Sequence, residues 1–111
     1  MPGMKAVVVS RTLRPADYPD LTIIGDDLEA QVARLREGPG KDIWLFGGGA
    51  LFQSLLDARL VDTVEVAVIP VLIGGGIPLL PPGAKRARLR LVSSKAYKKT
   101  GTVSLEYAVE K

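Results

Sequence analysis

Three consecutive glycines, Gly47–Gly49, are the feature of this sequence best suited to binding a ligand. They follow the apolar run Ile43–Phe46 and precede the segment Ala50–Ala58, where apolar residues recur at helical spacing. The first turn of a helix has unpaired backbone N–H groups, and glycine lets a bulky anion approach them. The arrangement suits a pyrophosphate, and a tight strand-to-helix turn with close packing explains the triplet equally well. It matches neither the G-x-G-x-x-G nor the Walker sequence.

A second candidate site is the tripeptide Ser10-Arg11-Thr12, which follows the β-branched run Lys5–Val9. A guanidinium between two hydroxyls suits a phosphate monoester, because it can form charge-assisted hydrogen bonds. The 2′-phosphate of NADPH is such a group. Taken as an isolated tripeptide, however, the segment is better explained as an ordinary polar strand end.

The absence of cysteine and histidine excludes several kinds of chemistry. Disulfides, thiolate catalysis, zinc sites and a Ser-His-Asp triad cannot be built, and we expect no metal site. Asp42, Asp57 and Asp62 lie near the glycine turn or the segment after it, but none is assigned a catalytic role. We expect Asp62 to form a structural hydrogen bond or ion pair, and we leave the catalytic residues unassigned.

The spacing of apolar residues predicts one α/β domain over residues 1–111. Strands alternate with short helices up to about residue 69, so we expect a mostly parallel sheet flanked by helices, followed by a C-terminal antiparallel hairpin. The predicted strands are 5–9, 21–24, 42–46, 61–69, 87–98 and 102–110, and the predicted helices run from Asp26 or Asp27 to Gly38 and over 50–58. We expect strand 42–46 to be central and covered on both faces, with Trp44 in the core.

Charge is unevenly distributed along the chain. Residues 84–111 carry eight basic and two acidic residues, whereas residues 1–83 carry seven basic and ten acidic ones. The basic segment could attract an anion or nucleic acid, but Tyr97 and Tyr107 are its only aromatic residues, so a solvated strand face is the better interpretation. No apolar run is long enough to cross a bilayer and no signal-peptide pattern is present, so we expect a cytoplasmic protein.

Together, these motifs resemble the dihydrofolate-reductase-like superfamily, and above all the C-terminal reductase domain of the bifunctional deaminase–reductase of riboflavin biosynthesis. The resemblance runs from VVVSRT through IWLFGGGALFQSLLDARLVDTVEVAVIPVLIGGGIPLL to the final hairpin. It implies that NADPH is the cofactor. The 2′-phosphate would be held by Ser10, Arg11 and Thr12. The pyrophosphate would be held by Gly47, Gly48, Gly49 and Ala50, which would also border the nicotinamide. Leu51 would pack beside the cofactor. It also implies a cis peptide between Gly47 and Gly48.

The chain departs from the family in its length. Domains of this family are longer and begin with a strand, a substrate-contacting loop and a helix that lie before the arginine-bearing strand. The chain therefore resembles the family without its usual N-terminal part, and we expect an uncovered sheet edge that favours a homodimer.

Three functions follow from the residues and the resemblance. The first is an NADPH-dependent reductase of a pterin-like or ribosylamino-pyrimidine substrate. The second is a non-catalytic nucleotide-binding or dimerisation module that keeps the fold. The third is a nucleic-acid binder using residues 84–111, which we consider remote, so the expected partners are a small-molecule substrate and a second copy, with no nucleic acid and no membrane.

Overall fold

The computed structural model describes residues 4–111 and divides them into two compact units. Unit 1 extends to Ile43, and unit 2 runs from Trp44 to Lys111. Among the described residues, no helix is long and apolar enough to cross a membrane.

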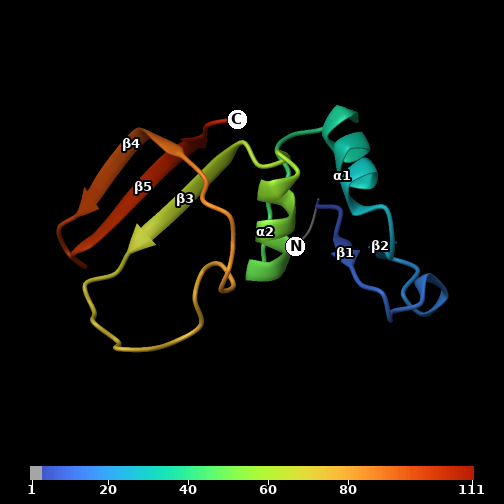
Figure 1. Cartoon of the computed structure of the whole chain (residues 1–111), viewed down its shortest axis with the longest axis horizontal. Helices are drawn as coiled ribbons and strands as arrows, with labels where there is room; N and C mark the ends of the chain where they lie inside the picture. The colour runs from blue at the N-terminus through green and yellow to red at the C-terminus, as the bar shows by residue number, and fades with distance from the viewer. Residues whose placement is uncertain (1–3) are drawn as a thin grey trace. The chain divides into compact units, whose positions relative to one another are not determined.

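Unit 1 is built around a two-stranded parallel sheet (Figure 1). Strand β1 (Val7–Val9) pairs with β2 (Thr22–Ile24), and Val9 lies opposite Ile24. A 3-10 turn over Pro15–Asp17 lies in the connection between them. The side chain of Ile24 is 2% exposed, so the end of β2 forms the core of this unit.

Helix α1 (Leu28–Glu37) follows β2 and begins and ends at the expected residues. Asp27 is the N-cap, but its φ of 51° is left-handed and its side chain makes no capping hydrogen bond. Gln31 instead donates from Nε2 to the carbonyl of Asp26 at 3.0 Å. The helix stops at Gly38, whose N–H donates to the carbonyl of Arg34 at 3.1 Å.

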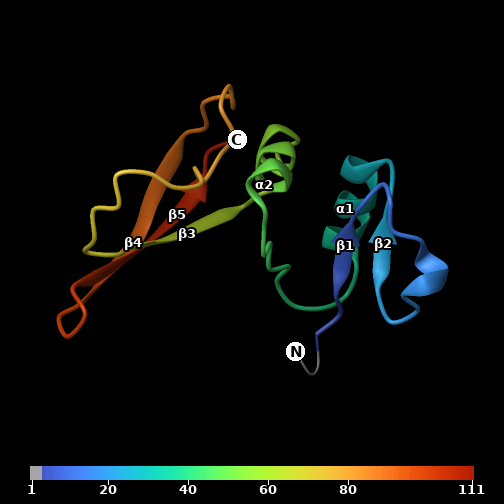
Figure 2. The ribbon, with the colours of Figure 1, turned by 90° about the horizontal axis from the view of Figure 1, so that it is seen from below.

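Unit 2 contains helix α2 and an antiparallel sheet of three strands (Figure 2). Every residue of the central strand is half-buried, because it has a neighbour on each side. Leu55 of α2 is 7% exposed and is the buried apolar side chain of this unit. The elements are α2 (Gly49–Asp57), β3 (Thr63–Val68), β4 (Leu89–Tyr97) and β5 (Thr102–Val109), in the sheet order β3-β5-β4.

The predicted C-terminal hairpin is confirmed. The N–H of Gly101 donates to the carbonyl of Tyr97 at 2.8 Å, and the φ of Gly101, 78°, is one that glycine adopts readily. A bulge between Leu91 and Ser93 interrupts the register of β4 with β5. All residues of β4 are exposed.

The prediction of a central strand over residues 42–46 is wrong. The structure assigns no strand there, and the side chains of Trp44 and Phe46 are 64% and 83% exposed. The two rings contact each other edge to face, with centroids 5.2 Å apart, instead of packing in a core. The physical reason is that no strand among the described residues pairs with this run. The sheet arrangement therefore also differs from prediction: one parallel pair and one antiparallel sheet replace a single mostly parallel sheet.

Candidate functional site

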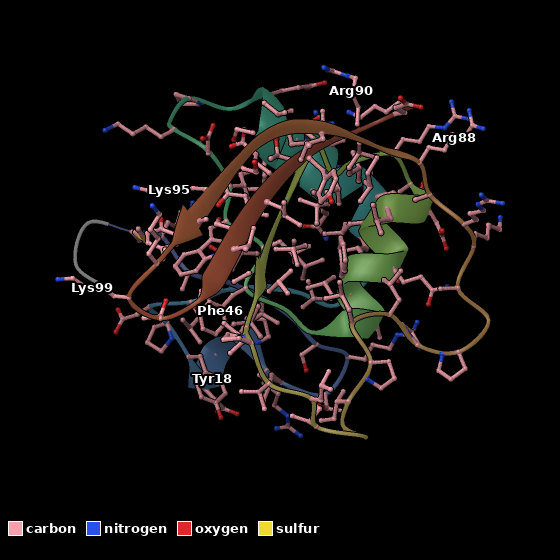
Figure 3. The ribbon with its side chains drawn as sticks, turned by 90° about the vertical axis from the view of Figure 1, so that its left-hand side faces the viewer. Tyr18, Phe46, Arg88, Arg90, Lys95 and Lys99 are labelled. Carbon is pink, nitrogen blue, oxygen red and sulfur yellow. The ribbon has the colours of Figure 1, made fainter. Side chains whose placement is uncertain are left out.

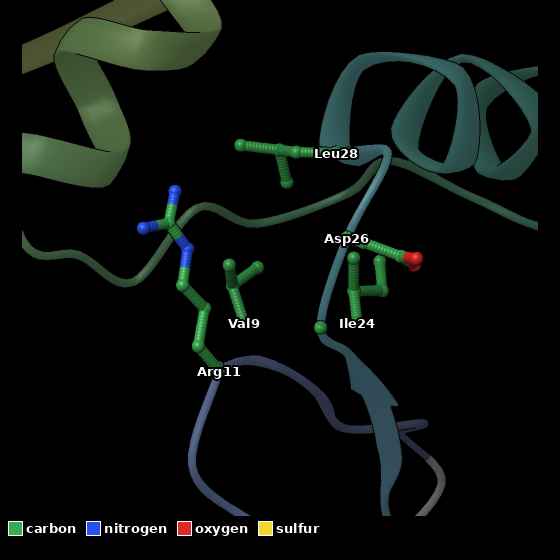
Figure 4. Close-up of a pocket in the computed structure, with 6 residues that line it drawn as sticks. Val9, Arg11, Ile24, Asp26 and Leu28 are labelled. Atoms are coloured by element: carbon green, nitrogen blue, oxygen red, sulfur yellow. The ribbon is translucent and has the colours of Figure 1, made fainter.

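A pocket of about 210 Å³ lies at the carboxyl ends of the two strands of unit 1 (Figure 4). The side chain of Arg11 stands on one side of Val9, and Leu28 reaches over from the start of α1. The carboxylate of Asp26 points away from Arg11. The lining residues are Val9, Arg11, Ile24, Gly25, Asp26 and Leu28.

The parallel pairing of β1 and β2 creates this pocket. Their shared register brings Val9 beside Ile24, and the N–H of Ser10 donates to the carbonyl of Ile24 at 3.0 Å. A Cβ atom at Gly25 would lie 3.4 Å from the carbonyl oxygen of Ser10, so the two chains stay close as they leave the sheet. In open α/β sheets, ligands bind beyond the carboxyl ends of the strands, and this pocket lies at that position.

Within the tripeptide, the hydroxyls and the guanidinium play different parts. The Oγ of Ser10 accepts hydrogen bonds from the N–H groups of Thr12 and Leu13, each at 3.2 Å, and lies 3.3 Å from the Oγ1 of Thr12. These contacts hold the turn after β1. Arg11 is exposed, and no carboxylate in residues 4–111 forms an ion pair with it. Its positive charge is therefore available to a ligand.

The glycine turn of unit 2 leaves open space beside its backbone. The peptide between Gly47 and Gly48 is cis, as the resemblance implies, and Gly47 has a φ of 134°. A Cβ atom at either residue would meet no atom within 4 Å. Gly48 caps α2 without a side-chain hydrogen bond, so the N–H groups of the first turn, including those of Ala50 and Leu51, have no capping side chain.

Gly49 has a different role from the two glycines before it. A Cβ atom there would lie 2.7 Å from the carbonyl oxygen of Leu79, closer than real Cβ contacts allow. The backbone of the long loop over residues 70–83 therefore packs against the start of α2. The close-packing interpretation holds for Gly49, whereas Gly47 and Gly48 keep room for a ligand.

The remaining glycines and carboxylates have structural explanations. Gly74, Gly75 and Gly76 form a second run of glycines in the loop over residues 70–83, and the φ values of Gly74 and Gly76, 71° and 144°, indicate that this run shapes a turn. The Nζ of Lys111 forms an ion pair with the Oδ1 of Asp62 at 2.6 Å, which confirms the predicted structural role of Asp62. No group of three or more carboxylates gathers within the part of the chain that the structure describes.

The structure brings the predicted site residues into two groups. Ser10, Arg11 and Thr12 lie together in unit 1, and residues 47–51 lie together in unit 2. That one dinucleotide contacts both groups stays a prediction. Sequence analysis missed the apolar wall of the pocket, formed by Val9, Ile24 and Leu28. The available signal was that these apolar residues end two adjacent strands and begin the next helix.

The parallel pair β1–β2, the two helices that follow it and the antiparallel sheet define an α/β protein. More specifically, this chain belongs to the RibD C-terminal domain family, which matches residues 3–103.

Two relatives and one solved structure are also similar to this chain. The uncharacterized Bacillus subtilis (strain 168) proteins YyaP and YwjB are each 34% identical to the chain, over 103 and 85 residues. These matches cover 93% and 75% of this chain but 54% and 49% of the relatives, so the chain spans about half their length. A Shewanella sp. PV-4 protein assigned to riboflavin biosynthesis shares the fold, with a TM-score of 0.80 and 22% identity, over 100% of this chain and 64% of the other.

The contrast between neighbouring glycines is testable by thermal unfolding. We expect Gly49→Ala to destabilise unit 2 by about 1–3 kcal/mol, because the new methyl group overlaps the Leu79 carbonyl. Gly48→Ala is the matched control, since its φ is −87° and its Cβ has open space, and its loss should be smaller. Equal melting temperatures for the two variants would contradict the packing role of Gly49.

Proposed function

We propose that this chain binds NADPH and forms the nucleotide-binding part of a reductase of the riboflavin-biosynthesis type. The substrate class would be a ribosylamino-pyrimidine or a pterin-like compound. Family membership supports this assignment, because RibD C-terminal domains are reductase domains that typically use a nicotinamide cofactor. The observation that carries it is the unpaired guanidinium of Arg11 at the wall of an apolar pocket.

The dimensions of the pocket favour one ring system over a whole cofactor. Sites that enclose drug-sized ligands measure about 300–1,000 Å³, whereas this pocket measures about 210 Å³. Val9, Ile24 and Leu28 supply apolar contact suited to the adenine base. Arg11, on the same wall, would then neutralise a phosphate on the adjoining ribose. NADPH carries that phosphate and NADH does not, so Arg11 would favour NADPH.

The glycine turn would hold the negative charge of the pyrophosphate by a different device. The N–H groups at the start of α2 lack side-chain caps and lie at the positive end of the helix dipole. Gly47 and Gly48 leave open space through which phosphate oxygens could approach. Leu51, half-buried in the first turn of the helix, would contribute apolar contact beside the cofactor.

The protein's part in such a reaction is binding and orientation. NADPH supplies a hydride when bound. Arg11 would fix the adenosine end by charge, and the first turn of α2 would fix the phosphates through the backbone. Both interactions would contribute affinity and position, and the group that transfers a proton stays unassigned.

Substitution of Arg11 tests the cofactor assignment. We expect Arg11→Ala to weaken NADPH binding about 10- to 100-fold, which corresponds to the loss of charge-assisted hydrogen bonds. NADH binding should change less than about twofold, because that ligand has no 2′-phosphate. Calorimetric titration with both cofactors measures the difference.

Arg14→Ala is the matched control for that titration. Arg14 is exposed, belongs to the same unit and does not line the pocket. It should leave both affinities unchanged. An Arg11→Ala variant that binds NADPH as tightly as the unaltered protein would remove the basis of the proposal.

The second candidate is a nucleotide-binding module without catalytic activity. The guanidinium of Arg11 and the uncapped N–H groups at the start of α2 suit nucleotide binding without assigning a proton donor, which favours such a module. An assay of NADPH oxidation across ribosylamino-pyrimidine and pterin substrates separates the two functions. We expect substrate-dependent oxidation from a reductase, whereas saturable NADPH binding without oxidation would support the module.

A further inference from the structure

The long loop over residues 70–83 has an unusual composition for a loop. It contains no charged residue. Its large apolar side chains are 62% to 102% exposed, and they belong to Val71, Leu72, Ile73, Ile77 and Leu79. Residues 72–80 form no hydrogen bond with another backbone group of the described chain. Apolar side chains gathered in one exposed segment usually mark a binding surface.

Two contacts hold the ends of this loop. At one end, a Cβ atom at Gly101 would lie 3.2 Å from the Cγ of Pro70, so the loop begins against the turn between β4 and β5, from which Lys99 projects (Figure 3). At the other end, the carbonyl of Leu79 packs against Gly49 at the start of α2. Figure 1 shows the loop leaving β3 and returning beside α2.

Three glycines divide the loop into two arms. Gly74 and Gly76 have φ values of 71° and 144°, and a Cβ atom at Gly74 or Gly75 would meet no atom within 4 Å. Glycine changes its backbone dihedral angles at little steric cost, so this run is a hinge. The first arm, residues 70–73, belongs to the contact with Gly101. The second arm, residues 77–79, belongs to the contact with Gly49.

The second arm brings Ile77 to the glycine turn before α2. Ile77 is two residues from Leu79, and Gly47 is two residues from Gly49, so both flank the same contact. Two residues span at most about 7 Å. Ile77 therefore lies near the open space beside Gly47 and Gly48. Its side chain is 99% exposed, so packing within the fold does not explain an isoleucine at this position.

We propose that Ile77 is a further ligand-binding residue, which covers the nicotinamide ring when NADPH occupies the glycine turn. The inference rests on the proposed function, which assigns the pyrophosphate to the start of α2. One ribose joins the nicotinamide to the pyrophosphate, so the ring would lie close to the turn. Phosphates need the backbone N–H groups, whereas the ring needs apolar contact and protection from water.

Ile77 suits this task because its arm is anchored at one end and hinged at the other. The contact of Leu79 with Gly49 keeps the arm beside the turn, and the hinge lets Ile77 move towards a ligand. Leu72 is equally exposed but lies in the first arm, beyond the hinge. The two side chains therefore differ in position and agree in exposure and apolar character.

Two ligands separate the role of Ile77 from the proposed function. The compound 2′-phospho-ADP-ribose keeps the adenosine, the 2′-phosphate and the pyrophosphate of NADPH but lacks the nicotinamide. Ile77→Ser should weaken NADPH binding about 5- to 20-fold, because an apolar contact is lost. It should change binding of 2′-phospho-ADP-ribose less than about twofold. Calorimetric titration measures both affinities.

Leu72→Ser is the matched control and should change neither affinity more than about twofold. Ile77→Leu should retain NADPH binding, because it keeps the apolar surface. All three variants should keep the far-UV circular dichroism spectrum, since the altered side chains are exposed.

Amide hydrogen exchange gives an independent readout. The amides of Gly76 and Ile77 make no backbone hydrogen bond and should exchange rapidly in the free protein. NADPH should slow their exchange, whereas 2′-phospho-ADP-ribose should not.

The outcomes distinguish this inference from the proposed function. If the unaltered chain binds both ligands and Ile77→Ser affects them equally or not at all, the inference is overturned and the proposed function stands. Equal losses of NADPH affinity in Ile77→Ser and Leu72→Ser would overturn it too. A chain that binds neither ligand would overturn both.

Discussion

A β-strand persists only where a neighbouring strand satisfies its backbone N–H and C=O groups, and this constraint governs which segments of the chain are ordered. β5 has two neighbours, and all of its residues are half-buried. β4 has one, and all of its residues are exposed. The run over residues 43–46 has none among the described residues. It consists of large apolar and aromatic residues, yet no strand forms there.

The features that sequence predicts correctly are those decided locally. Gly38 ends α1, Gly101 turns the hairpin, and the loop over residues 70–83 contains neither helix nor strand. Each depends on the backbone preferences of glycine or proline within a few residues. The strand predicted over residues 42–46 is absent because it depends on non-local contacts. Apolar composition indicates that a segment is suited to burial, but burial also requires another element that covers the segment. Trp44 is exposed because composition cannot supply that element.

The candidate site shows the same division between local and non-local information. Arg11 could be singled out from its residue type and its position at a strand end, whereas the apolar wall beside it depends on the parallel pairing of β1 with β2. The different roles of the three glycines likewise follow from a non-local contact. The Leu79 carbonyl packs against Gly49, whereas Gly47 and Gly48 have open space beside them. The basic C-terminal segment behaves as a solvated strand, with the Nζ of Lys95 lying 4.9 Å from the centre of the Tyr97 ring.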